Sequence, residues 1–401
     1  MAAQTTGSGI RARMRARPID EPHRGASPLE LLFDLTFVVA VAAVTARFAH
    51  DIADAHAMSG LVAFLQVFFA IWWAWMNFTW FASSYDNDDV GYRLLTMVQM
   101  AGVLVLAAGV PAAAEDGDYR GVTFGYLLMR VGLVSQWIRA GIEDPARRRT
   151  AFRYAAGFTL LQAGWLLRLL LAGTGNLPAA AEVPAFVVLS VLELAVPLWA
   201  ERTARTTWHP HHIAERYGLF TIILLGESVL AASRGVAGAL ETSAVDGPFV
   251  LVAGSGLVLL FALWWLYFLA PAGQGLRDRR HRSYLWGYGH YGIFAALAAV
   301  GAGLEVAVEQ TGHDLAASPL AICYAVAVPA AAFIVLLWLV HAPIAAQPAA
   351  HPAAVPGCAA AVLLLPLAEP LIGIAGVVAA LAAGCVLLIV LVLTPARGPA
   401  V

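Results

Sequence analysis

The feature that most constrains the fold is a succession of apolar segments, each about 20 residues long, that runs through almost the whole chain. A hydrocarbon core about 30 Å thick is crossed by a helix of this length. In lipid every backbone polar group must be paired within the protein, so isolated apolar segments of this kind are helical. Charged residues make up only 12% of the chain, against about 25% in soluble domains. The sequence therefore predicts an all-α polytopic membrane protein.

We predict about twelve transmembrane helices. The last two are ambiguous, because Pro366 and Pro370 interrupt one long apolar run, and eleven helices is the alternative count. The predicted segments lie near 28–49, 60–82, 92–113, 119–140, 151–172, 180–200, 212–233, 247–270, 284–306, 318–341, 354–371 and 372–394.

The placement of arginine predicts the sidedness of these helices. Cytoplasmic loops of membrane proteins carry an excess of basic residues. Arginines crowd the stretch before the first segment and recur in the loops near 147–149, 202–205 and 277–282, whereas the intervening loops are acidic or neutral. We therefore expect a multi-pass protein of the bacterial cytoplasmic (inner) membrane with a cytoplasmic N-terminus. Net charge is close to zero, so we expect the lipid bilayer as its surroundings and no nucleic-acid partner.

A weak internal repeat divides the chain in two. Glu30 and Thr36 match Glu215 and Thr221 at a common offset, and the sequence WWAW at 72–75 matches WWLY at 264–267. The alternative is that tryptophan pairs simply recur at membrane interfaces. Matching landmarks in the same order favour two parallel six-helix repeats. The predicted organisation is a cytoplasmic Arg-rich tail (1–27), a first repeat (28–200), a cytoplasmic linker (201–211), a second repeat (212–394) and a C-terminal tail (395–401).

Carboxylates inside these apolar segments are the strongest functional candidates, since a charge at bilayer depth costs at least about 2.5 kcal/mol. A series of acids at graded depth is what a proton or cation path needs. Glu30 and Glu215 have an alternative role at helix N-termini, where the helix dipole favours anions. Asp34 and Glu227 are too deep for that role. The predicted path is Glu30, Asp34, Glu215, Glu227 and Glu193.

Other polar groups are candidate partners of these acids. Arg130 lies within the fourth segment, and pairing with Glu193 or Glu227 would offset the cost of burying both charges. Arg216 lies beside Glu215 and is also an ion-pair candidate. His212 and Glu215 are three residues apart and are expected to interact across the start of their helix. His290 stands alone near the cytoplasmic end of its helix, where a pH-sensing role is conceivable.

An acidic cluster ends the second segment. Oxygen-rich clusters bind Mg²⁺ together with substrate phosphates in many enzymes, which makes Asp86, Asp88 and Asp89 a candidate metal or diphosphate site. The alternative is a solvated turn whose acids pair with Arg93. The stretch WHPHH at 208–212 has three histidines without a second ligand cluster, so we predict no metal there. We expect no cofactor unless the Mg²⁺ alternative holds.

Several of these motifs together resemble the bacterial low-temperature-requirement A family of integral membrane proteins. They are SPLELLFDLTFVVA (27–40), WWAWMNFTWFASSYDNDD (72–89) and HIAERYGLFTIILLGES (212–228), supported by LWWLYF (263–268) and the helix around His290. The family is named for a growth phenotype in the cold, so the resemblance implies a membrane protein without naming an activity.

Three functions are consistent with the sequence. The first is a transporter or channel-like protein that moves protons, cations or a coupled small solute past the intramembrane carboxylates. The second is a membrane-embedded, Mg²⁺-dependent enzyme acting on a lipid or isoprenoid diphosphate. The third is a non-catalytic envelope protein that supports growth in the cold. We favour the transporter.

Overall fold

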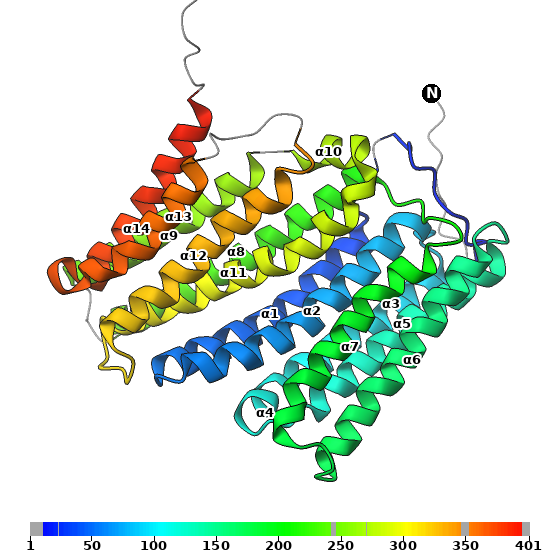
Figure 1. Ribbon diagram of the computed structural model, residues 1–401, viewed down its shortest axis with the longest axis horizontal. Coiled ribbons are helices and arrows are strands. Elements are labelled where there is room, and N and C mark those ends of the chain that lie inside the picture. The colour runs from blue at the N-terminus through cyan, green and yellow to red at the C-terminus, as the bar shows by residue number, and fades with distance from the viewer. Residues whose placement is uncertain (1–10, 23, 242–245, 270, 346–352, 395–401) are drawn as a thin grey trace, which may run out of the picture. The chain divides into compact units, whose positions relative to one another are not determined.

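The computed structural model describes residues 11–22, 24–241, 246–269, 271–345 and 353–394, without the side chains of 234–241. Every regular element in these ranges is a helix (Figure 1), which confirms the predicted all-α class. Each predicted segment overlaps a helix. The longer helices are α1 (Pro28–Ala53), α2 (Ala57–Tyr85), α3 (Val90–Ala108), α5 (Arg120–Glu143), α6 (Arg148–Gly173), α7 (Ala179–Ala200), α8 (Pro210–Glu241), α9 (Gly247–Phe268), α11 (Ser283–Glu309), α12 (Pro319–His341), α13 (Ala354–Leu364) and α14 (Glu369–Leu393). The short elements are α4 (Val110–Glu115), α10 (Ala272–Asp278), η1 (Arg280–Arg282) and η2 (Leu365–Ala368).

Within the described ranges, nine stretches are long and apolar enough to cross a membrane. They include α1, α2, α3, α6, α7, α9, α11 and α12, and the run from α13 to α14 counts as one. Helix α5 is not among them, because Arg130 and Gln136 interrupt its apolar sequence. Helix α8 is not among them either, and its side chains beyond Ser233 are not described. The structure thus supports a helical membrane protein with fewer candidate spans than the predicted twelve.

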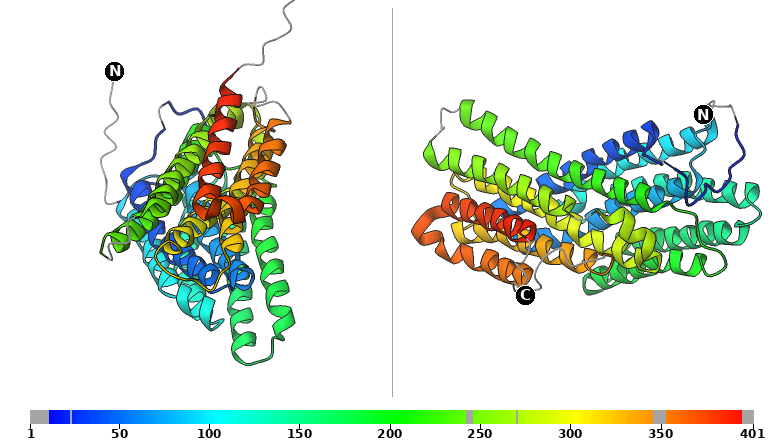
Figure 2. Two further views of the ribbon diagram at one scale, coloured as in Figure 1. Left: turned by 90° about the vertical axis from the view of Figure 1, so that its left-hand side faces the viewer. Right: turned by 90° about the horizontal axis from the view of Figure 1, so that it is seen from above.

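The last apolar run folds back on itself. The Cys358 thiol lies 3.7 Å from the carbonyl oxygen of Gly384. In one straight helix these residues would be about 39 Å apart at 1.5 Å per residue. Gly373 has φ 66°, a backbone conformation that favours glycine, and it breaks the helix between the two arms. Helices α13 and α14 therefore form a hairpin, seen in orange and red in Figure 2.

The chain divides into two compact units. Unit 1 comprises Met1–Ala43 and Phe69–Ile213, and unit 2 comprises Val44–Phe68 and Ala214–Val401. The boundaries fall inside α1, α2 and α8.

In unit 1, neighbouring helices of the series α3, α5, α6 and α7 pack side by side (Figure 1). The α3–α5 contact is made backbone to backbone. A Cβ atom added to Gly125 would lie 2.4 Å from the backbone nitrogen of Leu106, and one added to Gly121 would lie 2.7 Å from the Cα of Gly109. Small residues at such positions let two membrane helices approach closely.

In unit 2, α11 is the central helix. Most of its apolar residues are buried, and it packs along α12. A Cβ on Gly303 would lie 2.4 Å from the carbonyl oxygen of Ala325 in α12, and one on Gly301 would lie 2.3 Å from the Ser228 hydroxyl of α8. The small residues of α11 therefore form a packing face for two neighbouring helices.

Candidate functional site

The site in unit 1 is built around the first turn of α1. The Ser27 backbone N–H donates to the Glu30 carboxylate over 2.7 Å, and the Glu30 N–H lies 3.3 Å from the Ser27 hydroxyl. This reciprocal pairing is a capping box, and Pro28 occupies the first helical position, where its missing N–H costs nothing. The sequence SPLE therefore starts the helix and fixes the position of the Glu30 carboxylate.

The same carboxylate is the centre of a buried charge cluster. Glu30 and His212 are both completely buried, and the His212 Nε2 lies 3.0 Å from Glu30 Oε1. The Arg24 guanidinium lies between two acids, 3.5 Å from Glu30 and 3.4 Å from Asp86. One arginine thus faces two carboxylates, one from the first turn of α1 and one from the loop after α2. We call Arg24, Glu30, Asp86 and His212 the Glu30 cluster.

Asp86 lies just beyond α2 and is the titratable loop residue of this cluster. Burial raises its pKa, the nearby Glu30 carboxylate adds to the rise, and Arg24 and Arg17 oppose it, which leaves a pKa of about 6. Asp86 is therefore more readily protonated than an ordinary aspartate.

Asp34 lies one turn further along α1. Its carboxylate accepts a hydrogen bond of 2.7 Å from the Trp75 indole, and both side chains are buried. Four residues of α-helix correspond to a rise of about 6 Å, so Asp34 lies about 6 Å further along the axis of α1 than Glu30. The tryptophan run of α2 thus supplies a hydrogen-bond donor to an acid.

Glu193 forms a second buried pair. Its carboxylate lies 2.7 Å from Arg130 and accepts hydrogen bonds from the indoles of Trp73 (2.9 Å) and Trp165 (3.2 Å). The Arg130 guanidinium also lies 4.2 Å from the centre of the Phe158 ring. Of the two predicted partners of Arg130, the structure places Glu193 against it.

The acidic loop after α2 is divided among different arginines. Asp88 pairs with Arg93 over 2.7 Å on the surface. Asp89 is buried, caps α3 by accepting from the Tyr92 N–H (2.8 Å), and pairs with Arg139. Burial alone would raise the pKa of Asp89, but the hydrogen bonds from Arg139 and two backbone N–H groups outweigh it and lower the pKa to about 2. With Asp86 in the Glu30 cluster, the three acids do not converge on one point.

Residues 11–17 lie across these loops, and we call them the N-terminal strap. The Ala12 N–H donates to Asp89 (2.9 Å), the Met14 N–H donates to Glu143 (2.6 Å), and the Arg17 N–H donates to the Ser84 carbonyl (2.9 Å). The Met14 side chain is completely buried. Part of the predicted Arg-rich tail is therefore packed against unit 1.

In unit 2, the predicted residues of α8 differ in depth. Glu215 is exposed, whereas Arg216 and Glu227 are buried. The start of α8, up to Ile213, belongs to unit 1. It is capped by His209, whose Nδ1 accepts from the His212 N–H (3.2 Å), and the His212 imidazole contacts Glu30.

His290 is not the isolated residue that the sequence indicated. The Tyr267 hydroxyl lies 3.1 Å from its Nε2, and the Trp286 carbonyl lies 2.7 Å from its Nδ1. The His341 ring is 5.6 Å away between centroids, and the Tyr217 ring lies edge-on at 4.8 Å. Helices α8, α9, α11 and α12 thus bring an aromatic and histidine cluster together inside unit 2.

Sequence reasoning missed several residues of these sites. Arg24 and His341 were not singled out, and neither were Arg139 and Glu143, which hold the strap. The capping box at SPLE was a readable signal, since Ser and Glu stand three residues apart before an apolar run. The partners of the strap had no such signal, because they are more than 70 residues away in sequence. Among the described residues, no group of three or more His, Cys, Asp or Glu side chains is placed to hold a metal ion.

An all-helical chain with many apolar helices and buried ion pairs within them defines an integral membrane protein. The family model for the bacterial low temperature requirement A protein (LtrA) matches residues 25–394. The chain belongs to the LtrA family, as the sequence motifs indicated. It is also similar to "Uncharacterized protein RA0937" of Rhizobium meliloti (strain 1021), with 30% identity over 310 residues that cover 70% of each chain. No solved structure matches the chain.

Proposed function

We propose that this protein is a transporter or channel-like protein of the bacterial cytoplasmic membrane that moves protons, or a cation or small solute coupled to them. The observation that carries the proposal is the Glu30–His212 contact of 3.0 Å between two completely buried titratable side chains. Intramembrane ionisable residues usually mark substrate, ion or proton pathways.

The charges of the Glu30 cluster support proton exchange rather than a closed salt bridge. Arg24 is shared between Glu30 and Asp86, so one guanidinium faces two carboxylates. The second arginine near Asp86 is Arg17, at 3.7 Å, which is itself engaged by Glu21. A proton on His212 or Asp86 balances the excess negative charge of the cluster. When that proton is released, the cluster becomes negatively charged again.

Asp34 is the next acceptor in the proposed path. The Trp75 indole holds its carboxylate in place. Proton transfer needs donor and acceptor within about 3 Å or one intervening water. The spacing of about 6 Å between successive turns therefore requires a water molecule between Glu30 and Asp34. Glu227, buried in α8, is the proposed acid of unit 2.

Glu193 has a different proposed role. Its carboxylate already accepts from a guanidinium and two indoles, which fix it in position. A group held by three donors is a poor proton carrier. We therefore assign the Arg130–Glu193 pair to the scaffold that holds α2, α5, α6 and α7.

The proposed architecture has twelve spans in two parallel six-helix repeats. The α13–α14 hairpin supports two spans in the last apolar run. The repeat is supported by the matching sequence landmarks, Glu30 and Thr36 with Glu215 and Thr221, and WWAW with WWLY. Arginine placement supports a cytoplasmic N-terminus.

The Mg²⁺-dependent enzyme is less favoured. Asp86, Asp88 and Asp89 each face a different arginine, so a shared cation would require all three side chains to turn. Mg²⁺ demands near-ideal octahedral geometry, which dispersed carboxylates do not supply.

The test is a pH-jump flux assay on purified protein in liposomes. Glu30→Gln and Glu227→Gln should each abolish proton-linked flux, because an amide cannot exchange the proton. Asp54→Asn is the matched control, since Asp54 is an exposed acid paired with His50, and it should keep wild-type flux. Absence of flux above that of empty liposomes with protons and several cations would refute the transport proposal. Mg²⁺-dependent turnover of a prenyl diphosphate that is lost in Asp88→Asn would instead support the enzyme.

A further inference from the structure

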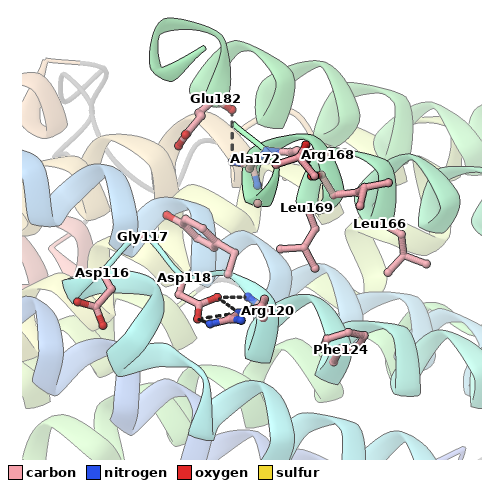
Figure 3. A pocket seen from close by; sticks show the side chains of 14 residues that line it. Asp116, Gly117, Asp118, Arg120, Phe124, Leu166, Arg168, Leu169, Ala172 and Glu182 are labelled. Atoms are coloured by element: carbon pink, nitrogen blue, oxygen red, sulfur yellow. Dashed lines mark hydrogen bonds and ion pairs between the residues drawn. The ribbon is translucent and has the colours of Figure 1, made fainter. Parts of the chain in front are cut away.

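A cavity of about 960 Å³ opens in unit 1 at the end of α3 opposite Asp89. Its walls come from the loop after α4 and from α5, α6 and the start of α7 (Figure 3). This volume lies at the upper end of the range for small-molecule sites. The cavity lies outside the Glu30 cluster and shares no residue with it.

Arg168 is the group that points to a ligand. Its side chain is only 8% exposed, and its guanidinium lies 5.4 Å from the centre of the Tyr119 ring and 5.9 Å from that of Phe186. The Glu182 charge acts on it, yet among the described residues no carboxylate forms an ion pair with it. Its guanidinium makes a single long hydrogen bond of 3.4 Å to the backbone carbonyl of Glu182, and its Nε has no partner. A buried cation without a counter-ion is costly unless a ligand supplies the negative charge.

The carboxylates around the cavity differ in whether they form ion pairs. Asp118 is held by Arg120, with both of its oxygens 2.9 Å from the Arg120 Nε. Asp116 and Glu182 form no ion pair among the residues that the structure describes. The cavity therefore offers one cation without a contacting carboxylate and two carboxylates outside ion pairs, of which Glu182 lies near enough to act on Arg168. This arrangement suits a ligand that carries both charges.

The remaining wall is apolar. Phe124 and Leu170 line the cavity and are exposed on the helix surface, and Leu166 and Leu169 lie beside them. Because α6 and α7 are apolar enough to cross a membrane, this wall is where hydrocarbon chains would lie. A water-soluble zwitterion without acyl chains would not contact this apolar wall favourably.

We propose that the cavity binds the headgroup of an aminophospholipid. The phosphate is held by Arg168 through charge-assisted hydrogen bonds. The primary ammonium lies toward Asp116 and Glu182, and the acyl chains lie along the leucines and Phe124.

Native mass spectrometry of the detergent-solubilised protein tests this with dioctanoyl-phosphatidylethanolamine as the probe. Arg168→Gln should weaken binding at least about tenfold, the loss of one charge-assisted hydrogen bond. Glu182→Gln should weaken binding of this lipid and leave dioctanoyl-phosphatidylglycerol unaffected, because that lipid has no ammonium. Arg153→Gln is the matched control: Arg153 lies on the same helix and also stacks on an aromatic ring, that of Trp199, but it does not line the cavity, so the variant should bind as the wild type does.

Three outcomes would overturn the proposal. The first is wild-type affinity in folded Arg168→Gln. The second is wild-type affinity for dioctanoyl-phosphatidylethanolamine in Glu182→Gln. Because Glu182 is only half-buried, this variant stays informative if Arg168→Gln fails to fold. Equal affinity for free phosphoethanolamine would assign the cavity to a soluble zwitterion and is the third.

Discussion

The Arg130–Glu193 pair allows a sharp test of the assigned scaffold role. Both side chains are almost completely buried, with side-chain exposures of 4% and 0%. Replacing Glu193 with Leu leaves the Arg130 charge buried without its partner. Removing one member of a buried ion pair costs about 3–5 kcal/mol. It also leaves the indole N–H groups of Trp73 and Trp165 without their acceptor, at about 1–3 kcal/mol for each one that stays unsatisfied.

The reverse substitution should cost less. In Arg130→Met the Glu193 carboxylate keeps both indole donors. The double variant Arg130→Met/Glu193→Leu removes both charges, and replacement of a buried ion pair by apolar residues is often close to neutral. We therefore expect the double variant to be more stable than Glu193→Leu alone, with a coupling free energy of about 1–3 kcal/mol.

Heating followed by size-exclusion chromatography in detergent measures the order of stability. Glu193→Leu should lower the apparent melting temperature by at least about 5 °C, and the double variant should recover part of that loss. Additive losses in the double variant would refute a direct interaction. A Glu193→Leu variant as stable as the wild type, but inactive in proton flux, would place Glu193 in the path instead of the scaffold.

Three further predictions concern the loops and the packing of unit 1. The folded protein holds a proton on Asp86 up to a pKa of about 6, against an ordinary 3.8, so this group stabilises the fold fully below pH 3.8 and that contribution is lost as pH rises through 6. The loss of stability is at most about 3 kcal/mol. Melting temperatures of Asp86→Asn measured between pH 4 and about 8 should not show this pH-dependent loss. Asp89→Ala should destabilise by about 1–2 kcal/mol through the lost helix cap and should accelerate trypsin cleavage in the N-terminal strap; unchanged cleavage would show that Asp89 does not hold the strap. Gly125→Leu should abolish the folded monomer peak, because its Cβ would lie 2.4 Å from the backbone of Leu106, whereas Gly173→Leu, which has open space around it, should not.

The sequence was sufficient for the helices because apolar length is a local property. Every predicted segment overlaps a helix, and the two prolines that interrupt the last run lie just before Gly373, where it folds back. The span count was less accurate, since Arg130 and Gln136 make α5 too polar to be recognised by apolarity alone. A helix whose polar residues face protein partners does not need to be apolar along its whole length.

The contacts of the candidate site were less predictable. Sequence spacing placed Glu30 and Asp34 on one helix, but it could not bring His212 to Glu30 across more than 180 residues. It also took His290 to be isolated, because Tyr267 and His341 belong to other helices. Which residues meet is decided by helix packing, and helix packing depends on long-range fit rather than on local pattern.

Glu30 serves both the start of a helix and a buried charge cluster. As part of the capping box it accepts the Ser27 N–H, which fixes its carboxylate at the start of α1. That position leaves its second oxygen to His212 and Arg24. The local sequence SPLE therefore sets the position of this carboxylate, and Arg24 and His212 reach it from outside the helix. In the proposed transport function, Glu30 is the fixed acceptor of the path for this reason.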